Sequence, residues 1–79
     1  MNDGKVLARF NKNEWEHVRL TLQPWEGKRF VEFRIYKNPD ESTNKGFTLR
    51  LRLLPELQKA LEKAMAILKA EIADDERQR

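Results

Sequence analysis

The stretch VRLTLQPWEGKRFVEFRIY, residues 18–36, decides the fold because apolar and polar residues alternate on both sides of a short break. A two-residue period is typical of β-strands that bury one face. The break is Trp25-Glu26-Gly27-Lys28, in which Gly27 can adopt the positive φ of a tight turn. The sequence therefore predicts two antiparallel strands joined as a hairpin.

The positions that alternate with the apolar set carry cations and aromatic rings. We expect them on one face of the sheet, with Trp25 at a corner of the turn. The residues predicted there are Arg19, Lys28, Phe30, Arg34 and Tyr36. One face of the hairpin is thus predicted to be basic and aromatic.

Two further strands are predicted on either side of the hairpin. Residues 5–10, KVLARF, alternate and are expected to form the first strand. Residues 37–46 are polar with Pro39 and Gly46 near their ends, which favours one long loop. Residues 47–53, FTLRLRL, alternate again and would add Arg50 and Arg52 to the basic face.

A helix is predicted to follow, because Pro55-Glu56 suits a first helical turn and the next residues are rich in Ala, Leu, Glu and Lys. Its apolar stripe is expected to cover the sheet and to offer a flank to a second copy of the chain. The residues expected at that dimer interface are Leu57, Leu61, Met65, Leu68 and Ile72. The acidic end, within residues 73–79, is expected to fray.

Length and composition indicate one domain over residues 1–79, with an ordered core of about 5–72. The net charge of +3 is unevenly distributed: residues 1–54 hold eleven basic and seven acidic side chains, whereas residues 55–79 hold five and six. The chain has no Cys and no apolar run near the roughly 20 residues of a membrane span. We therefore expect an intracellular protein with no membrane partner, cytoplasmic or nucleoid-associated in a bacterium and nuclear in a eukaryote.

Residue types that catalysis requires are sparse. His17 is the single histidine and is expected to be solvated, and the three glycines are isolated, so no triad, multi-histidine metal site or phosphate-cradling loop is predicted. The carboxylates cluster only in the acidic end. We expect no enzyme, no cofactor and no metal.

The basic and aromatic face favours a nucleic-acid ligand. Outward cations on strands are most often a solvated surface. An exposed ring, however, leaves apolar area in water, whereas stacking a base on it contributes about 1–3 kcal/mol. The combination of rings and cations therefore favours a surface that binds single-stranded nucleic acid over a solvated charged surface without a ligand.

Four motifs in order resemble those of the positive cofactor four family of single-stranded-DNA-binding transcriptional coactivators, in its short bacterial form. They are Trp25-Glu26-Gly27-Lys28, residues 31–36 (VEFRIY), residues 45–49 (KGFTL) and Pro55-Glu56. The likeness covers roughly residues 16–68. It departs from the family pattern at Gln23, Ile35 and Lys37, which replace a basic, an acidic and an aromatic residue, and in a longer segment before Pro55.

The resemblance implies an α+β fold, namely a curved four-stranded antiparallel sheet followed by one C-terminal helix, and a homodimer joined through the helices. It implies non-sequence-specific binding of single-stranded DNA, with Trp25 stacking on a base and Lys28, Arg34 and Lys45 contacting the strand. The full set of predicted nucleic-acid-binding residues is Arg19, Trp25, Lys28, Phe30, Arg34, Tyr36, Lys45, Arg50 and Arg52.

Two alternatives stay open from the sequence. Exposed aromatic residues and an open sheet edge also fit a protein-interaction module that docks a transcription partner. Single-stranded RNA remains a second possible ligand, because stacking and phosphate contacts do not read the 2′-hydroxyl.

Overall fold

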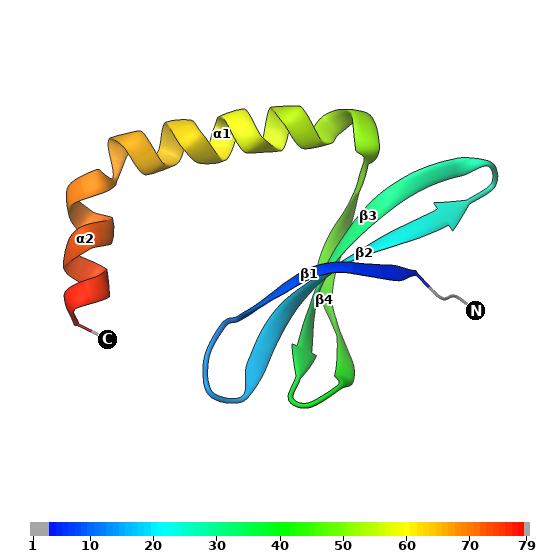
Figure 1. The fold of residues 1–79 in the computed structure, drawn as a ribbon, viewed down its shortest axis with the longest axis horizontal. Helices are drawn as coiled ribbons and strands as arrows, with labels where there is room; N and C mark the ends of the chain where they lie inside the picture. Colours follow the sequence, from blue (N-terminus) through cyan, green and yellow to red (C-terminus); the bar gives the residue numbers. More distant parts are fainter. Residues whose placement is uncertain (1–3, 79) are drawn as a thin grey trace.

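A computed structural model of the chain describes residues 4–78. Four strands form one antiparallel sheet in the order β1-β2-β3-β4, and a helical segment follows (Figure 1). The strands are β1 (Lys5–Asn11), β2 (Glu16–Trp25), β3 (Lys28–Lys37) and β4 (Glu41–Arg50). The helical segment consists of a 3-10 turn, η1 (Leu51–Leu53), and the helices α1 (Leu54–Ile67) and α2 (Lys69–Arg77). The predicted α+β class and four-stranded antiparallel sheet are confirmed.

The central hairpin is confirmed and is longer than predicted. β2 and β3 pair in continuous register from Glu16 opposite Lys37 to Trp25 opposite Lys28. The two-residue turn has positive φ at both central positions, 49° at Glu26 and 77° at Gly27. Two consecutive positive φ angles are typical of a type I′ turn, whose twist matches that of the flanking strands.

The register sorts the hairpin into two faces, because residues directly opposite one another point to the same side. We call one side the polar face: it carries His17, Arg19, Thr21, Gln23 and Trp25 of β2 and Lys28, Phe30, Glu32, Arg34 and Tyr36 of β3. We call the other the apolar face: it carries Val18, Leu20, Leu22, Val31, Phe33 and Ile35, extended by Phe47 and Leu49 of β4.

The predicted alternation of β1 is interrupted by a bulge between Val6 and Ala8. Val6 therefore lies opposite Thr21 on the polar face, whereas Ala8 and Phe10 lie opposite the apolar residues Leu20 and Val18. A bulge inserts one unpaired residue and so reverses the side to which the following residues point.

The long loop predicted for residues 37–46 is wrong. The chain reverses over a short turn containing the cis Asn38-Pro39 bond, and β4 begins at Glu41. Residues 41–46 contain no apolar side chain, so no alternation marked them as a strand. They pair at the edge of the sheet, where most of their side chains are exposed.

The last strand also ends earlier than predicted. β4 stops at Arg50, and residues 51–53 form η1 instead of continuing the alternating strand. α1 begins at Leu54, with Pro55 in its first turn and Glu56 as the acidic residue there. The predicted helix start is therefore confirmed to within one residue.

The helical segment is not one continuous helix. It breaks at Leu68, where φ is −101° and ψ is 16°, and α2 turns away from the axis of α1 (Figure 1). Neither Pro nor Gly lies at the break. α2 continues to Arg77, which bonds Asp74 at 3.1 Å, so the segment expected to fray is helical through Arg77.

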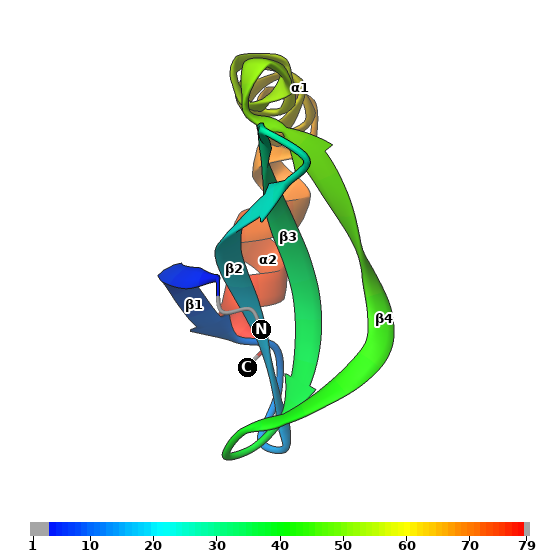
Figure 2. The ribbon, with the colours of Figure 1, turned by 90° about the vertical axis from the view of Figure 1, so that its right-hand side faces the viewer.

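The expectation that the helix covers the sheet of its own chain is wrong. α1 leaves the end of the sheet and extends beyond it (Figures 1 and 2). Val31 is the one fully buried apolar residue among those described, and α1 and α2 bury none of their residues. The chain spans 43 × 30 × 18 Å. In a single copy, Leu61, Met65, Ile67 and Leu68 of the helical segment therefore stay in contact with water.

Candidate nucleic-acid interface

The register places most of the predicted site on the polar face. Arg50 joins it from β4, because it lies directly opposite Phe30. The predicted residues that share this face are Arg19, Trp25, Lys28, Phe30, Arg34, Tyr36 and Arg50. Arg52 lies in η1, and Lys45 lies in β4 where the register shifts between Arg34 and Tyr36.

An open hollow of about 410 Å³ lies on the polar face near the β2–β3 turn. Its lining residues are Gln23, Pro24, Trp25, Phe30, Glu32 and Thr48. The Trp25 side chain is 65% exposed, so its ring is free to receive a planar group. We call this site the aromatic hollow.

Cations flank the aromatic hollow. Lys28 lies directly opposite Trp25 and is exposed, and Arg50 lies directly opposite Phe30 and is half-buried. Neighbouring strands lie about 4.8 Å apart, so these cations stand next to the rings. A planar aromatic surface beside positive charge suits an unpaired base and its phosphate.

The other end of the polar face is a closed polar cluster. The Arg19 guanidinium donates to Asp40 Oδ1 at 2.6 Å, contacts His17 Nε2 at 3.1 Å and lies 3.9 Å above the Tyr36 ring. The Arg19 side chain is only 14% exposed. Arg19 and Tyr36 therefore contact one another within the sheet, and Arg19 exposes little surface to a ligand.

The expectation that His17 is solvated is wrong, because its side chain is fully buried. The ring stacks on Tyr36 at 5.4 Å between centroids, and its Nδ1 is 2.7 Å from Asn38 Oδ1. Because Arg19 can only donate, Nε2 is the acceptor and Nδ1 carries the proton that is donated to Asn38. Apolar periodicity could not reveal this role, since His17 occupies a position predicted to face solvent.

Arg34 is also engaged within the chain. Its guanidinium pairs with Glu32 and donates to the carbonyl oxygen of Thr43 at 2.7 Å. The hydrogen bond that Arg34 donates to Glu32 raises the pKa of Arg34 above its ordinary value, despite an opposing effect of burial. Its side chain remains 30% exposed, at a position between the polar cluster and the aromatic hollow.

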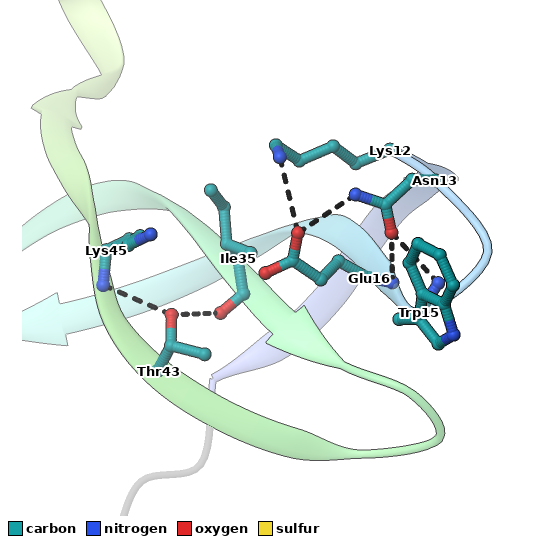
Figure 3. A network of polar contacts seen from close by, with 7 residues as sticks. All are labelled: Lys12, Asn13, Trp15, Glu16, Ile35, Thr43 and Lys45. Carbon is teal, nitrogen blue, oxygen red and sulfur yellow. Dashed lines mark hydrogen bonds and ion pairs between the residues drawn. The ribbon is translucent and has the colours of Figure 1, made fainter.

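Thr43 fixes the irregular part of β4. Its hydroxyl donates to the carbonyl oxygen of Ile35 at 2.7 Å and accepts from the backbone N–H of Lys45 at 3.1 Å (Figure 3). These bonds anchor the backbone of Lys45 while its side chain stays exposed.

Trp15 was not among the predicted site residues, yet its side chain is 70% exposed. It lies in the β1–β2 turn, where Asn13 Oδ1 accepts the backbone N–H of Trp15 and of Glu16 at 2.9 and 2.8 Å (Figure 3). This turn is at the opposite end of β2 from Trp25. A tryptophan within a polar turn sequence was the signal that could have singled it out.

Within residues 4–78, no group of three or more potential metal-ligating side chains comes together. Over the same residues, no helix is long and apolar enough to cross a membrane.

Solved structures of a PC4 (positive cofactor four) homolog from Burkholderia pseudomallei K96243 are similar to this chain. Its orthorhombic crystal form superposes with a TM-score of 0.74, covering 81% of this chain and 92% of the homolog at 24% sequence identity. Its tetragonal form gives 0.71, with 78% and 97% covered at the same identity.

The chain has a PC4-like fold. The predicted resemblance is thus confirmed at the level of the fold. No protein-family model matches the sequence, and no curated protein is significantly similar to it. In this PC4-like fold, the aromatic hollow lies at the turn end of the β2–β3 hairpin, where the pairs Pro24–Arg29 and Trp25–Lys28 extend beyond the register of the described residues of β1 and β4.

Proposed function

We propose that the protein binds single-stranded DNA as a homodimer, without requiring a fixed sequence. The observation that carries this proposal is the aromatic hollow, whose rings Trp25 and Phe30 lie directly opposite Lys28 and Arg50 on the neighbouring strands. The PC4-like fold supports it. The ligand is one that presents unstacked bases, because a ring can stack only on a base that is free of a duplex.

The proposed binding surface is smaller than the sequence predicted. Trp25 and Phe30 stack bases, and Lys28, Lys45, Arg50 and Arg52 contact phosphates. Arg34 contributes its exposed edge. Arg19 and Tyr36 act indirectly, because they pack in the polar cluster that keeps the sheet in shape. Neutralised phosphates release counterions, so affinity falls steeply as salt rises.

A second copy of the chain is the proposed cover for the apolar surface. The stripe on the helices is exposed, with Leu61 54%, Met65 57% and Leu68 46% accessible. The apolar face has its own unfilled hollow of about 280 Å³ beside Phe33 and Phe47, whose rings stack at 4.7 Å. Complementary apolar surfaces on the same chain favour a symmetric pair, with Leu57, Leu61, Met65, Leu68 and Ile72 at the contact.

In the cell, the proposed role is that of a transcription coactivator or regulator, or of a nucleoid- or repair-associated protein, acting where DNA strands are separated. Such a role requires no catalysis. Single-stranded RNA is the alternative ligand, and competition between matched DNA and RNA oligonucleotides distinguishes the two.

The decisive experiment replaces each of two exposed tryptophans. Trp25→Ala is expected to weaken oligo-dT binding by about 1–3 kcal/mol, roughly 5- to 150-fold, because it removes a stacking surface. Trp15→Ala removes an equally exposed indole from the other end of the sheet and is the matched control, with an unchanged dissociation constant. Fluorescence anisotropy of a labelled oligonucleotide measures both.

Three outcomes would contradict the proposal. These are equal effects of the two substitutions, binding to duplex that equals binding to single strands, and affinity that does not change with salt. Circular dichroism of Trp25→Ala checks that the fold is retained, as expected for a side chain that is 65% exposed.

A second candidate role, docking of a transcription partner, is favoured by Trp15. Its exposed ring lines a hollow with Glu14, Glu16 and Glu41, and with Lys37 as the cation of the set. This surface is separate from the aromatic hollow. A pull-down that retains a protein but no nucleic acid, and that depends on Trp15 but not on Trp25, would favour this role.

A further inference from the structure

The aromatic hollow contains a carboxylate, which a surface built only for phosphates would exclude. Glu32 lines the hollow and is 17% exposed. It lies on the polar face beside Phe30, between Thr21 of β2 and Thr48 of β4. Because a carboxylate only accepts hydrogen bonds, a ligand group that contacts Glu32 must carry hydrogen-bond donors.

Arg34 satisfies only one side of this carboxylate. Its Nη2 donates to Glu32 Oε2, and no described residue donates to Oε1. The same pair fixes the orientation of the carboxylate, because Arg34 is itself held by the carbonyl oxygen of Thr43. Glu32 thus presents a fixed acceptor to the aromatic hollow.

The neighbouring polar groups add acceptors to the hollow. Gln23 donates its amide N–H to the Thr21 hydroxyl at 3.0 Å, and no residue among 4–78 donates to its carbonyl oxygen. The Thr48 hydroxyl, on the other side of Glu32, can donate or accept. The hollow therefore combines aromatic walls with a surface rich in hydrogen-bond acceptors.

We propose that the aromatic hollow is a base subsite in which Glu32 selects bases that carry an exocyclic amino group, cytosine above thymine. This inference rests on the proposed binding of single-stranded nucleic acid and adds a preference at one position to it. The preference modulates an affinity that stacking and phosphate contacts dominate.

The two pyrimidines differ in the edge that they present to an acceptor. Cytosine offers the N4 amino group, and carboxylates accept from this group in known base readout. Thymine has a carbonyl oxygen at that place, and its one ring N–H lies between two carbonyl oxygens that the carboxylate repels. Both rings have the same size, so stacking on Trp25 discriminates little between them.

The test compares oligo-dC with oligo-dT of equal length at constant salt and slightly alkaline pH. Wild-type protein is expected to bind oligo-dC roughly five- to tenfold more tightly, the lower part of the range for a base contact. An oligonucleotide of N4,N4-dimethylcytosine, which lacks the amino hydrogens, is expected to lose this advantage. That comparison uses the unmodified protein and does not depend on the folding of a variant.

Glu32→Gln identifies the residue responsible. The amide offers a donor as well as an acceptor, so the ratio of the two dissociation constants is expected to fall to within about twofold of unity. The matched control is Glu26→Gln, which removes the same charge from the turn next to Trp25 but outside the hollow. It is expected to leave the ratio unchanged, because loss of a charge raises affinity for every sequence alike.

The outcomes separate this inference from the proposed function. Equal, salt-sensitive affinities for oligo-dC and oligo-dT would overturn the base selection and leave single-strand binding intact. A preference that survives in Glu32→Gln would overturn the assignment to Glu32. Absence of binding to every oligonucleotide would instead refute the proposed function.

Discussion

At the scale of single residues, the polar face divides into a part that can bind and a part that holds the sheet together. His17, Arg19 and Asp40 form a chain of contacts that joins β2 to the β3–β4 turn. Arg19 Nε is buried without a hydrogen-bond partner in the described structure, so the guanidinium depends on its remaining contacts. A cation on the predicted binding face can therefore serve the fold rather than the ligand.

The ion pair of this cluster predicts a pH dependence. The hydrogen bond from Arg19 holds the pKa of Asp40 below its ordinary value of 3.8. Because the folded-state pKa is the lower one, the stabilisation is fully present above pH 3.8 and is lost as the pH falls through the folded-state pKa. Wild type is expected to be more stable than Asp40→Asn at neutral pH, and this difference should vanish in strong acid.

Urea unfolding of both proteins at fixed protomer concentration, repeated over a series of pH values, measures the difference. A difference between wild type and Asp40→Asn that does not change with pH would contradict the ion pair. The pKa of Glu16 is also lowered, chiefly by its hydrogen bond from Asn13. Glu16 contributes equally to both proteins, so subtracting the unfolding free energy of Asp40→Asn from that of wild type removes its contribution.

At the scale of elements, β4 depends on one glycine for its close approach to β3. Gly46 lies opposite Arg34, and a Cβ at Gly46 would stand 2.3 Å from the carbonyl oxygen of Phe33. That distance is well below van der Waals contact with a backbone atom that cannot rotate away. The Lys-Gly motif that suggested the family resemblance is thus also a packing requirement of the sheet.

Gly46→Ala is accordingly expected to destabilise the protein by about 1–3 kcal/mol, because β4 must shift away from β3. Thr48→Ala, in the same strand and exposed, is the control and is expected to change stability by less than about 0.5 kcal/mol. Chemical denaturation followed by circular dichroism gives both values. A Gly46→Ala protein as stable as wild type would show that the strand has room to move.

Particular elements show how far the sequence determined the structure. The β2–β3 hairpin and its Gly27 turn were predicted because apolar alternation and a turn residue coincide there. The first half of β4 was missed because an exposed edge strand needs no apolar residue, and hydrogen bonds of Thr43 fix it instead. The break at Leu68 has no local signal of any kind, since residues around it favour a helix.

The sequence predicted which residues lie at the candidate site better than it predicted what each of them does there. Alternation placed Trp25, Phe30 and Arg50 together correctly, because a strand fixes which side chains share a face. It could not tell that Arg19 is paired with Asp40, which is distant in sequence. Nor could it show that Glu32 enters the aromatic hollow, because a carboxylate between cations resembles an ordinary charged surface.

At the scale of the whole molecule, both the helices and the sheet expose large apolar side chains. Burying a Leu, Met or Ile side chain contributes about 1.5–3 kcal/mol, so several such residues exposed together strongly favour association. A small domain also gains the core that it lacks by pairing. The proposed dimer rests on the same exposure that made the expected helix-on-sheet packing wrong.

Leu61→Glu is expected to convert the dimer to a monomer, or to lower its association constant by more than about 100-fold, because a buried unpaired charge costs several kcal/mol. Lys63→Glu places the same new carboxylate on the opposite side of α1 and is the control, which should remain dimeric. Light scattering coupled to size exclusion measures the mass of each. A wild-type chain that elutes as a monomer would refute the pairing.

The two ends of the β2–β3 hairpin differ in the number of contacts that hold them in place. Asn38 bonds the carbonyl oxygens of Glu14 and Trp15 and the ring of His17, which ties both turns at one end into a single unit. The turn around Gly27 extends past its neighbours, and a Cβ at Gly27 would touch nothing within 4 Å. Fewer contacts therefore hold the hairpin at the Trp25 end than at the Asn38 end, so we expect its rigidity to decrease toward Trp25. The tip can follow the uneven contour of a flexible polymer while the anchored end keeps its shape.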